Sequence, residues 1–298
     1  NLFRVVNTLH GGFFYCVILF EVQMEKYGLL GCPLGHSLSP FIHKCLFEAS
    51  GKPCSYDLFE ISENDLPARA AALKELGGFN VTIPHKINII QYLDELDEKA
   101  ALFGAVNTVK NGKKSVGYNT DCAGFLRALD AAGISLSGKV LLCGTGGVAR
   151  MIAFEAVLHG CDLTVAYRKP SSDKAKEIQN EIKNKLHQTI TLAEYANLAE
   201  GWDLIVNGTS AGMFPNVDAS PLAKNIVCSA GTVYDVIYNP AETLFLQLAK
   251  QAGIPYSNGL SMLVWQAAVA QEIWMDVHFS NADVERVIQK TEKELLNR

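Results

Sequence analysis

The chain has 298 residues, of which 49% are hydrophobic and 19% are charged, and its net charge is −5 at pH 7. Length and apolar content suffice for two domains, and the acidic balance disfavours nucleic acid as a partner. No apolar run approaches the roughly 20 residues of a membrane-spanning helix, and the eight cysteines contain no C-x-x-C pair, so we expect a cytoplasmic protein with neither a membrane partner nor a metal site.

The first 23 residues differ from those that follow. The apolar fragment "GGFFYCVILF" comes after Arg4, as the core of a leader does, but no small-residue cleavage site follows it. Three interpretations stay open: an extension with no role in activity, an added strand or partner contact, and a leader. We therefore treat residues 1–23 as an extension of unknown role.

From Met24 onward, short apolar runs alternate with segments of helical periodicity, and Gly- and Pro-rich turns separate them. The alternation predicts strands packed against helices. In chain order we expect a strand and turn over 26–34, a helix over 39–50, a strand over 54–61, a helix over 63–76, a strand over 78–83, a helical segment over 97–105, and two extended pieces around a turn at 111–114.

A second cycle of strands and helices begins near residue 139. Its expected elements are a strand over 139–143, a glycine turn and helix over 144–160, a strand over 161–169, a helix over 171–186, strands over 202–210 and 231–239, and helices over 261–275 and 281–296. This order predicts an α/β fold with mostly parallel sheets.

The two cycles predict two domains. We expect residues 24–122 and 260–298 to form an α/β domain, because the last two helices can pack back onto it. Residues 123–259 are expected to form a Rossmann-type nucleotide-binding domain. A helix near 122–133 joins the two domains in this interpretation.

The fragment "CGTGGVA" places three glycines, Gly144, Gly146 and Gly147, between a predicted strand and a predicted helix. Glycines at this point let the backbone turn tightly and approach a pyrophosphate, whose charge is met by amide groups at the helix start. A tight turn without a ligand is the alternative. The flanking strand and helix favour dinucleotide binding.

The end of the next strand bears on the choice of cofactor. An NAD-binding domain usually has an acidic residue there, which accepts hydrogen bonds from the ribose. This chain has Arg168 and Lys169 instead, and two cations attract the 2′-phosphate of NADP. The sequence therefore favours NADP, although an exposed basic strand end is the alternative.

A lysine and an aspartate follow two predicted strand ends. Lys86 lies just beyond the strand over 78–83, and Asp121 closes the fragment "GYNTD". Strand ends are where α/β sheets place ligand chemistry, so both side chains can face one cleft. An ammonium can give a proton to a ligand oxygen while the carboxylate orients it. A purely structural ion pair is the competing interpretation.

Two serines, Ser37 and Ser39, lie on a loop at a predicted helix start. Their hydroxyls, together with backbone amides, suit a carboxylate or a group of hydroxyls, although serines of this kind are also ordinary helix caps. His36 and His85 have no evident partner in the sequence, and we do not assign either one as a catalytic base.

Taken as a series, these fragments resemble the shikimate dehydrogenase family between about Lys26 and Gln271. The fragments that carry the resemblance are "GCPLGHSLSPFIHK", "FNVTIPHK", "AVNT", "GYNTD", "GTGGVAR", "VNGTSAGM", "DVIYNP" and "NGLSMLVWQAA". The resemblance implies an enzyme that uses NADP to interconvert 3-dehydroshikimate and shikimate, a step in chorismate and aromatic amino acid biosynthesis.

The resemblance also implies roles for individual residues. It makes Lys86 and Asp121 the catalytic pair and places Gly259 near the nicotinamide. The residues that it assigns to the substrate are Ser37 and Ser39 for the carboxylate, Thr82, Asn107 and Gln266 for the hydroxyls, and Tyr238 nearby.

One departure affects the cofactor. NADP-dependent members of the family often read Asn-Arg-Thr after the second Rossmann strand, whereas this chain has Tyr167, Arg168 and Lys169.

Two functions other than an NADP-dependent shikimate dehydrogenase stay open. One is a quinate/shikimate dehydrogenase that uses NAD or NADP, and the other is a non-catalytic nucleotide or metabolite sensor on the same fold. A homodimer is compatible with the sequence, which does not fix the oligomeric state.

Overall fold

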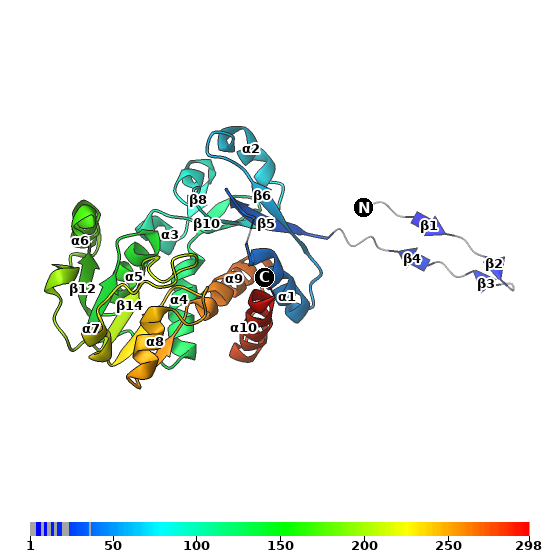
Figure 1. Ribbon diagram of the computed structural model, residues 1–298. Coiled ribbons are helices and arrows are strands. Elements are labelled where there is room, and N and C mark those ends of the chain that lie inside the picture. Colours follow the sequence, from blue (N-terminus) through cyan, green and yellow to red (C-terminus); the bar gives the residue numbers. More distant parts are fainter. Residues whose placement is uncertain are drawn as a thin grey trace.

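The computed structural model describes residues 4–6, 9–10, 13–14, 17–19, 24–35 and 37–297. Two six-stranded sheets with packed helices form two lobes, coloured blue to cyan and green to yellow in Figure 1. Most of the extension predicted over residues 1–23 lies outside the described residues. Its described parts are four short strands, of which the outer and inner pairs are antiparallel: β1 (Arg4–Val6) with β4 (Val17–Leu19), and β2 (Leu9–His10) with β3 (Phe13–Phe14).

The sheet of the first lobe is mixed and has the strand order β6-β5-β7-β9-β10-β8. Strand β5 is parallel to β6 and β7, and β8 is parallel to β10, while β9 is antiparallel to both of its neighbours. The strands are β5 (Lys26–Gly31), β6 (Ser55–Glu60), β7 (Gly78–Val81), β8 (Glu95–Leu96), β9 (Thr108–Lys110) and β10 (Val116–Tyr118).

The sheet of the second lobe has the order β13-β12-β11-β14-β15-β16, and neighbouring strands are parallel throughout. The order reverses between β11 and β14, which is where doubly wound sheets bind ligands. The strands are β11 (Lys139–Cys143), β12 (Asp162–Tyr167), β13 (Thr191–Glu194), β14 (Leu204–Asn207), β15 (Thr232–Asp235) and β16 (Tyr256–Ser257).

Ten α-helices are described, and none of the helices in the described part of the chain is long and apolar enough to cross a membrane. The α-helices are α1 (Ser39–Ser50), α2 (Leu66–Leu73), α3 (Glu98–Phe103), α4 (Thr120–Ala131), α5 (Gly147–Leu158), α6 (Ser172–Leu186), α7 (Lys224–Cys228), α8 (Leu244–Gln251), α9 (Leu260–Met275) and α10 (Asn281–Leu296). Three 3₁₀ turns accompany them: η1 (Asn88–Tyr92), η2 (Lys169–Ser171) and η3 (Tyr195–Asn197).

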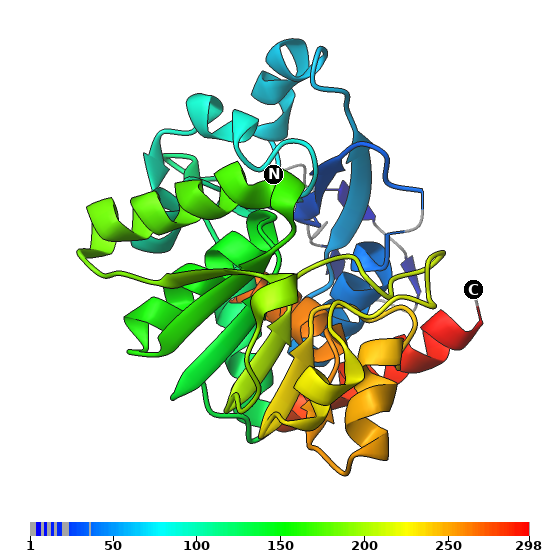
Figure 2. The same ribbon diagram turned by 60° about the vertical axis from the view of Figure 1, so that its left-hand side comes forward.

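Alternating side chains of the second sheet feed two separate cores. In β11, Val140 and Leu142 join the core beneath α5 and α6, whereas Leu141 and Cys143 join the core beneath α7 and α8. This period of two is the one expected of a strand that is covered on both faces. Figure 2 shows the green and yellow strands with helices on either side.

Helix α9 returns to the first lobe after the second sheet is complete. It is apolar around most of its circumference, as expected of a buried helix. Trp274 donates its indole N–H to the Val109 carbonyl oxygen at 2.9 Å and stacks on Tyr27 with ring centroids 4.7 Å apart. Close to the other end of α9, Gly124 of α4 lets the two helices meet, because a Cβ there would lie 2.8 Å from the Gln266 backbone nitrogen.

Candidate active site

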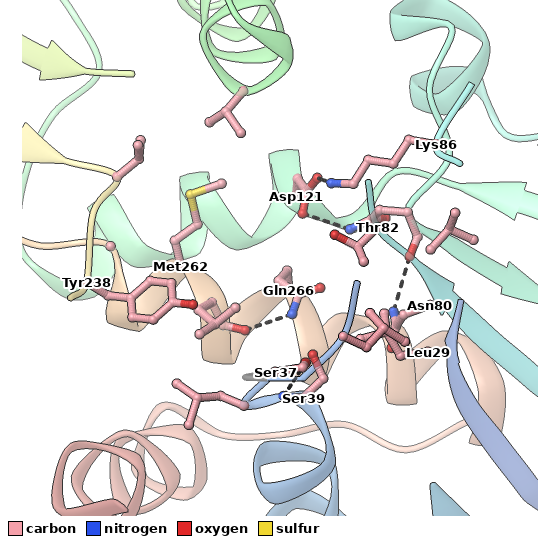
Figure 3. Close-up of a pocket in the computed structure, with 18 of the residues that line it drawn as sticks. Leu29, Ser37, Ser39, Asn80, Thr82, Lys86, Asp121, Tyr238, Met262 and Gln266 are labelled. Atoms are coloured by element: carbon pink, nitrogen blue, oxygen red, sulfur yellow. Dashed lines mark hydrogen bonds and ion pairs between the residues drawn. The ribbon is translucent and has the colours of Figure 1, made fainter. Parts of the chain in front are cut away.

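A cavity of about 670 Å³ is lined by residues from both lobes. Figure 3 shows its polar side chains converging from the ends of strands and the starts of helices. The cavity brings together nine residues that the sequence or the resemblance selects and a tenth, Asn80, that neither does. The nine are Ser37, Ser39, Thr82, Lys86, Asn107, Asp121, Tyr238, Gly259 and Gln266.

Lys86 and Asp121 meet inside this cavity. The Lys86 Nζ atom lies 2.6 Å from Asp121 Oδ2, and the two side chains are 30% and 18% exposed. Lys86 follows β7, and its carbonyl oxygen accepts a hydrogen bond from the Val106 amide at 2.8 Å. Asp121 lies in the first turn of α4, where the helix dipole favours a negative charge. A partly buried pair of this kind can hold a proton donor beside a ligand oxygen.

Asn107 lies at the base of the pair and is 3% exposed. Its side-chain nitrogen donates to Asp121 Oδ1 at 2.8 Å, and its side-chain oxygen accepts from the Thr120 amide at 2.6 Å. Asn107 therefore contacts the catalytic carboxylate candidate directly, a contact that the sequence analysis did not anticipate.

Sequence reasoning also missed Asn80, which lines the cavity from β7. Its side-chain oxygen accepts from the Tyr56 hydroxyl at 2.8 Å. Burial raises the pKa of the Tyr56 phenol well above its ordinary value, while a hydrogen bond with Ser39 acts in the opposite sense, so the phenol keeps its proton. The available signal was a single amide side chain inside the apolar strand "GFNV".

The two serines lie at the start of α1. The Ser39 backbone N–H donates to Ser37 Oγ at 3.2 Å, and both residues line the cavity. Ser39 is the first residue of the helix, so amide donors and hydroxyls gather at one point, an arrangement that suits an anionic ligand. His36 lies outside the described residues.

The remaining predicted ligand residues come from three elements. Thr82 follows β7, and its backbone N–H donates a hydrogen bond to the Leu30 carbonyl oxygen at 2.8 Å. Gln266 lies on α9, where its side-chain nitrogen donates to the Leu263 carbonyl oxygen at 2.8 Å. Tyr238 reaches the cavity from the segment after β15.

Gly259 marks the closest approach of two backbone segments beside the cavity. A Cβ at this position would lie 2.0 Å from the Val236 carbonyl oxygen, so no larger residue fits without a shift. The absence of a side chain therefore lets these two backbone segments pack together beside the cavity.

The described histidines near the cavity are held in the core. His85 is fully buried, and its Nε2 atom lies 2.6 Å from the Ile61 carbonyl oxygen. His43 stacks on Tyr56 with ring centroids 4.1 Å apart, and burial lowers its pKa to about 3. Neither ring is among the residues that line the cavity, and of the two only His85 was considered, and not assigned as a base, in the sequence analysis.

A second, smaller cavity of about 230 Å³ lies at the carboxyl ends of the second sheet's strands. Gly144 adopts φ +112°, a conformation that favours glycine. A Cβ at Gly146 or Gly147 would meet no described atom within 4 Å, so both open onto free space. The cavity is lined by Gly144, Thr145, Gly146, Tyr167, Arg168, Ser171, Tyr195, Gly208, Thr209 and Ser210.

These residues fit a dinucleotide. Helix α5 begins at Gly147, and its N-cap residue Gly146 has no side chain, so the first amide groups are accessible to phosphate oxygens. Arg168 is exposed at the end of β12 and lines the same cavity. The arrangement leaves a cation where a ribose phosphate would lie.

The comparisons with known proteins agree with this geometry. Residues 29–109 match the family model described as the shikimate dehydrogenase substrate binding domain. A shikimate dehydrogenase (NADP(+)) of Methanococcus maripaludis strain C6 is 41% identical over 265 residues, which cover 86% of this chain and 93% of that protein.

Solved structures extend the likeness to the whole fold. The shikimate 5-dehydrogenase of Thermus thermophilus, in complex with NADP(H) and shikimate, is 32% identical with a TM-score of 0.80, covering 90% of this chain and 99% of that chain. The enzyme of Listeria monocytogenes, in complex with shikimate and NAD, is 33% identical with a TM-score of 0.82, covering 92% and 96%.

A parallel sheet with a glycine turn, facing a polar cavity on a second lobe, is typical of two-lobed α/β oxidoreductases. Identity of 41% over most of both chains makes the assignment more specific. The chain belongs to the shikimate dehydrogenase family.

Proposed function

We propose that this protein is an NADP-dependent shikimate dehydrogenase, which reduces 3-dehydroshikimate to shikimate reversibly in the chorismate and aromatic amino acid pathway. The observation that carries the proposal is the contact of 2.6 Å between Lys86 and Asp121 within a cavity that both lobes line. A sensor on the same fold would not need this pair beside its ligand.

In the proposed reaction, Lys86 and Asp121 act on the oxygen of the reacting carbon. In the direction of reduction, the Lys86 ammonium donates a proton to the carbonyl oxygen, and in oxidation the lysine accepts the proton of the hydroxyl. Asp121 orients the Lys86 side chain through the contact of its Oδ2 atom. When bound, the cofactor would supply the hydride as NADPH in reduction and accept it as NADP⁺ in oxidation.

The proposed substrate roles are those that the family resemblance implies, and the lining of the cavity supports them. Ser37 and Ser39, beside the start of α1, hold the carboxylate of the acid. Thr82, Asn107 and Gln266 contact its hydroxyls from three different elements, and Tyr238 lies at the opposite wall. Convergence from several elements fixes the orientation of the ring before the chemical step.

The cofactor roles rest on the second cavity. Gly144, Gly146 and Gly147 let the pyrophosphate approach the amide groups of α5, and Gly259, which lines the larger cavity, lies near the nicotinamide. Arg168 binds the 2′-phosphate, so NADP is preferred over NAD.

The division of labour between lobes follows from these assignments. We assign residues 24–122 and 260–298 to a substrate-binding and catalytic domain, and residues 123–259 to the cofactor domain. The hydrogen bond of 2.5 Å from Lys110 Nζ to the Ile273 carbonyl oxygen supports the grouping of α9 with the first sheet. We also propose that the protein is cytoplasmic and that it can form a homodimer.

Steady-state kinetics with two acids and two cofactors test the function. We expect oxidation of shikimate with NADP to be the most efficient of the four combinations of shikimate or quinate with NADP or NAD. Comparable efficiency on quinate with NAD would favour a quinate/shikimate dehydrogenase. Binding of shikimate and NADP without turnover would favour a sensor.

A further inference from the structure

We infer that Thr108 is a positioning residue, the central link of a buried chain of hydrogen bonds that connects Tyr56 with the Asp121 carboxylate. The chain runs through the side chains of Asn80, Thr108, Thr120 and Asn107. This inference rests on the proposed function, because its effect is exerted on the Lys86–Asp121 pair.

The orientation of the Asn107 amide is fixed by the backbone. The Thr120 N–H lies 2.6 Å from one end of the amide, and a backbone N–H can only donate. That end must therefore be the oxygen. The NH₂ end then faces Asp121 Oδ1, at 2.8 Å. The Asn107 NH₂ group is therefore the donor to the Asp121 carboxylate.

The orientation of the Asn80 amide is fixed in the same way at the far end of the chain. One end of its side chain lies 3.3 Å from the Asn107 carbonyl oxygen, which can only accept, so this end must be the NH₂ group. The oxygen then faces Tyr56, whose hydroxyl donates to it at 2.8 Å. The same NH₂ group donates to Thr108 Oγ1 at 3.0 Å.

The two threonine hydroxyls connect these two amides. Thr108 Oγ1 accepts from Asn80 and lies 3.1 Å from Thr120 Oγ1, a contact in which either hydroxyl can donate. Thr120 Oγ1 contacts both ends of the Asn107 amide: it accepts from the NH₂ group at 3.0 Å and lies 3.2 Å from the oxygen. Thr108 therefore joins the Asn80 amide to the residues that hold Asn107 against Asp121.

The chain is shielded from water at its centre. Asn80, Asn107, Thr108 and Thr120 are between 0% and 5% exposed. Hydrogen bonds in such surroundings polarise one another, so a break in the middle weakens the last donor as well. Asp121 receives Asn107 on Oδ1 and Lys86 on Oδ2. The chain therefore holds the carboxylate in the rotamer that places Oδ2 against the lysine.

Replacement of Thr108 by valine tests the inference, because it removes the hydroxyl while keeping the branched shape. We expect Thr108→Val to lower kcat for shikimate with NADP by up to about 10-fold, the upper end of the cost of losing one hydrogen bond between neutral groups. The KM for shikimate should rise less than kcat falls, because the serines and Gln266 are untouched and only the contact of Asn107 with the substrate is affected. Thr108→Ser keeps the hydroxyl and should restore kcat to within about 2-fold of the wild type.

A matched control separates positioning from packing. Thr291→Val also removes a fully buried hydroxyl, which donates to the Val287 carbonyl oxygen in α10. It should lower stability but leave kcat unchanged. An unchanged kcat in Thr108→Val, or a Thr108→Ser variant as slow as Thr108→Val, would overturn the inference.

Tyr56→Phe tests the chain from its outer end without touching the threonines. If Tyr56 and Thr108 act in series, the double variant Tyr56→Phe/Thr108→Val should be no slower than Thr108→Val alone. Multiplication of the two single effects on kcat would contradict a chain. A wild type without shikimate turnover would refute the proposed function instead, so the two failures are distinguishable.

Discussion

Among single residues, Asp235 shows how burial near the cofactor site controls stability. This aspartate ends β15, is fully buried, and accepts hydrogen bonds from Thr243 Oγ1 at 2.6 Å and from the Ile237 amide and Asn207 Nδ2 at 3.0 Å. Burial raises the pKa of its carboxyl from 3.8 to about 6, although the hydrogen bonds act in the opposite sense.

The raised pKa of Asp235 predicts a pH dependence of stability. The folded state binds this proton more tightly than the unfolded state, so the stabilisation is complete below pH 4 and is lost as the pH rises through about 6. Relative to Asp235→Asn, the wild type should lose about 3 kcal/mol of unfolding free energy between pH 4 and pH 7. Urea unfolding of both proteins across this range checks the prediction, and parallel curves would contradict it.

Arg168 carries the second prediction at this scale. If its guanidinium binds the 2′-phosphate, Arg168→Gln should raise the KM for NADP by about 10-fold or more, because a charge-assisted hydrogen bond is lost. The KM for NAD should stay within about 2-fold, since NAD has no phosphate there. Lys183→Gln, at an exposed lysine of α6, is the matched control. An equal rise in the KM for NADP and for NAD would mean that Arg168 does not bind the 2′-phosphate.

Some site residues were predictable from the sequence and others were not. Lys86 and Asp121 follow strand ends, and this position alone brought them to attention. Asn80 was visible as a polar residue in an apolar strand, but its bond to Tyr56 joins strands that are not neighbours in the sheet. The sequence carries no local signal for such a contact, and the same holds for the bond between Asn107 and Asp121.

At the scale of elements, the meeting of α4 and α9 sets Asp121, the proposed catalytic carboxylate, relative to Gln266, a proposed substrate residue. Asp121 begins α4 and Gln266 lies on α9, and Gly124 sits at their contact. Gly124→Val would force a branched side chain into the Gln266 backbone, so we expect a loss of about 1–3 kcal/mol in unfolding free energy.

The same substitution should raise the KM for shikimate, because Gln266 moves relative to Asp121. Urea unfolding and steady-state kinetics measure the two effects. Ala131→Val, at the exposed end of α4, is the control and should change neither by much. A Gly124→Val variant with wild-type stability would show that the helices can separate without cost.

Long elements with strong periodicity were the easiest to predict. The helix expected over 39–50 coincides with α1, whereas the helix expected over 63–76 is shorter and spans Leu66–Leu73. Pro67 stands in the first turn of α2, a position that marks a helix start more closely than the apolar pattern did. Two-residue strands such as β8 and β16 were missed, because pairing with a neighbour defines them rather than any pattern of their own.

Across the whole molecule, an ion pair with one buried partner joins the two lobes. Lys99 of α3, whose side chain is 38% exposed, lies 2.5 Å from Oε1 of Glu155, which sits in the middle of α5 and is fully buried. Lys99→Met would leave this carboxylate with only the His159 ring, 3.8 Å away, and we expect a loss of at most about 3 kcal/mol in unfolding free energy. Adding Glu155→Gln to Lys99→Met should restore most of that loss.

An exposed pair supplies the control for this prediction. Lys114 and Glu95 also form an ion pair, with side chains that are 61% and 50% exposed. Lys114→Met should therefore cost less than about 1 kcal/mol. Urea unfolding of the variants compares the two pairs. An equal loss of unfolding free energy in Lys99→Met and Lys114→Met would contradict a larger contribution from the Lys99–Glu155 pair.

The order of strands and helices along the chain gave the fold class, because two cycles of alternation predict two α/β units. The order of strands within each sheet did not follow from the pattern. In the first sheet β9 is antiparallel to β7, a pairing that no apolar pattern in either strand indicates. The contact between Lys99 and Glu155 joins residues 56 positions apart and has no local signature.

The central claim is that Lys86 and Asp121 carry the proton transfer, and the turnover of Lys86→Ala tests it most directly. Formation of reduced NADP on addition of shikimate gives kcat, and the dependence on shikimate gives KM. We predict that kcat falls by about 100-fold or more while KM changes much less, and that the Lys114→Ala control stays at the wild-type rate. A wild-type kcat in Lys86→Ala, with only the KM raised, would contradict the account.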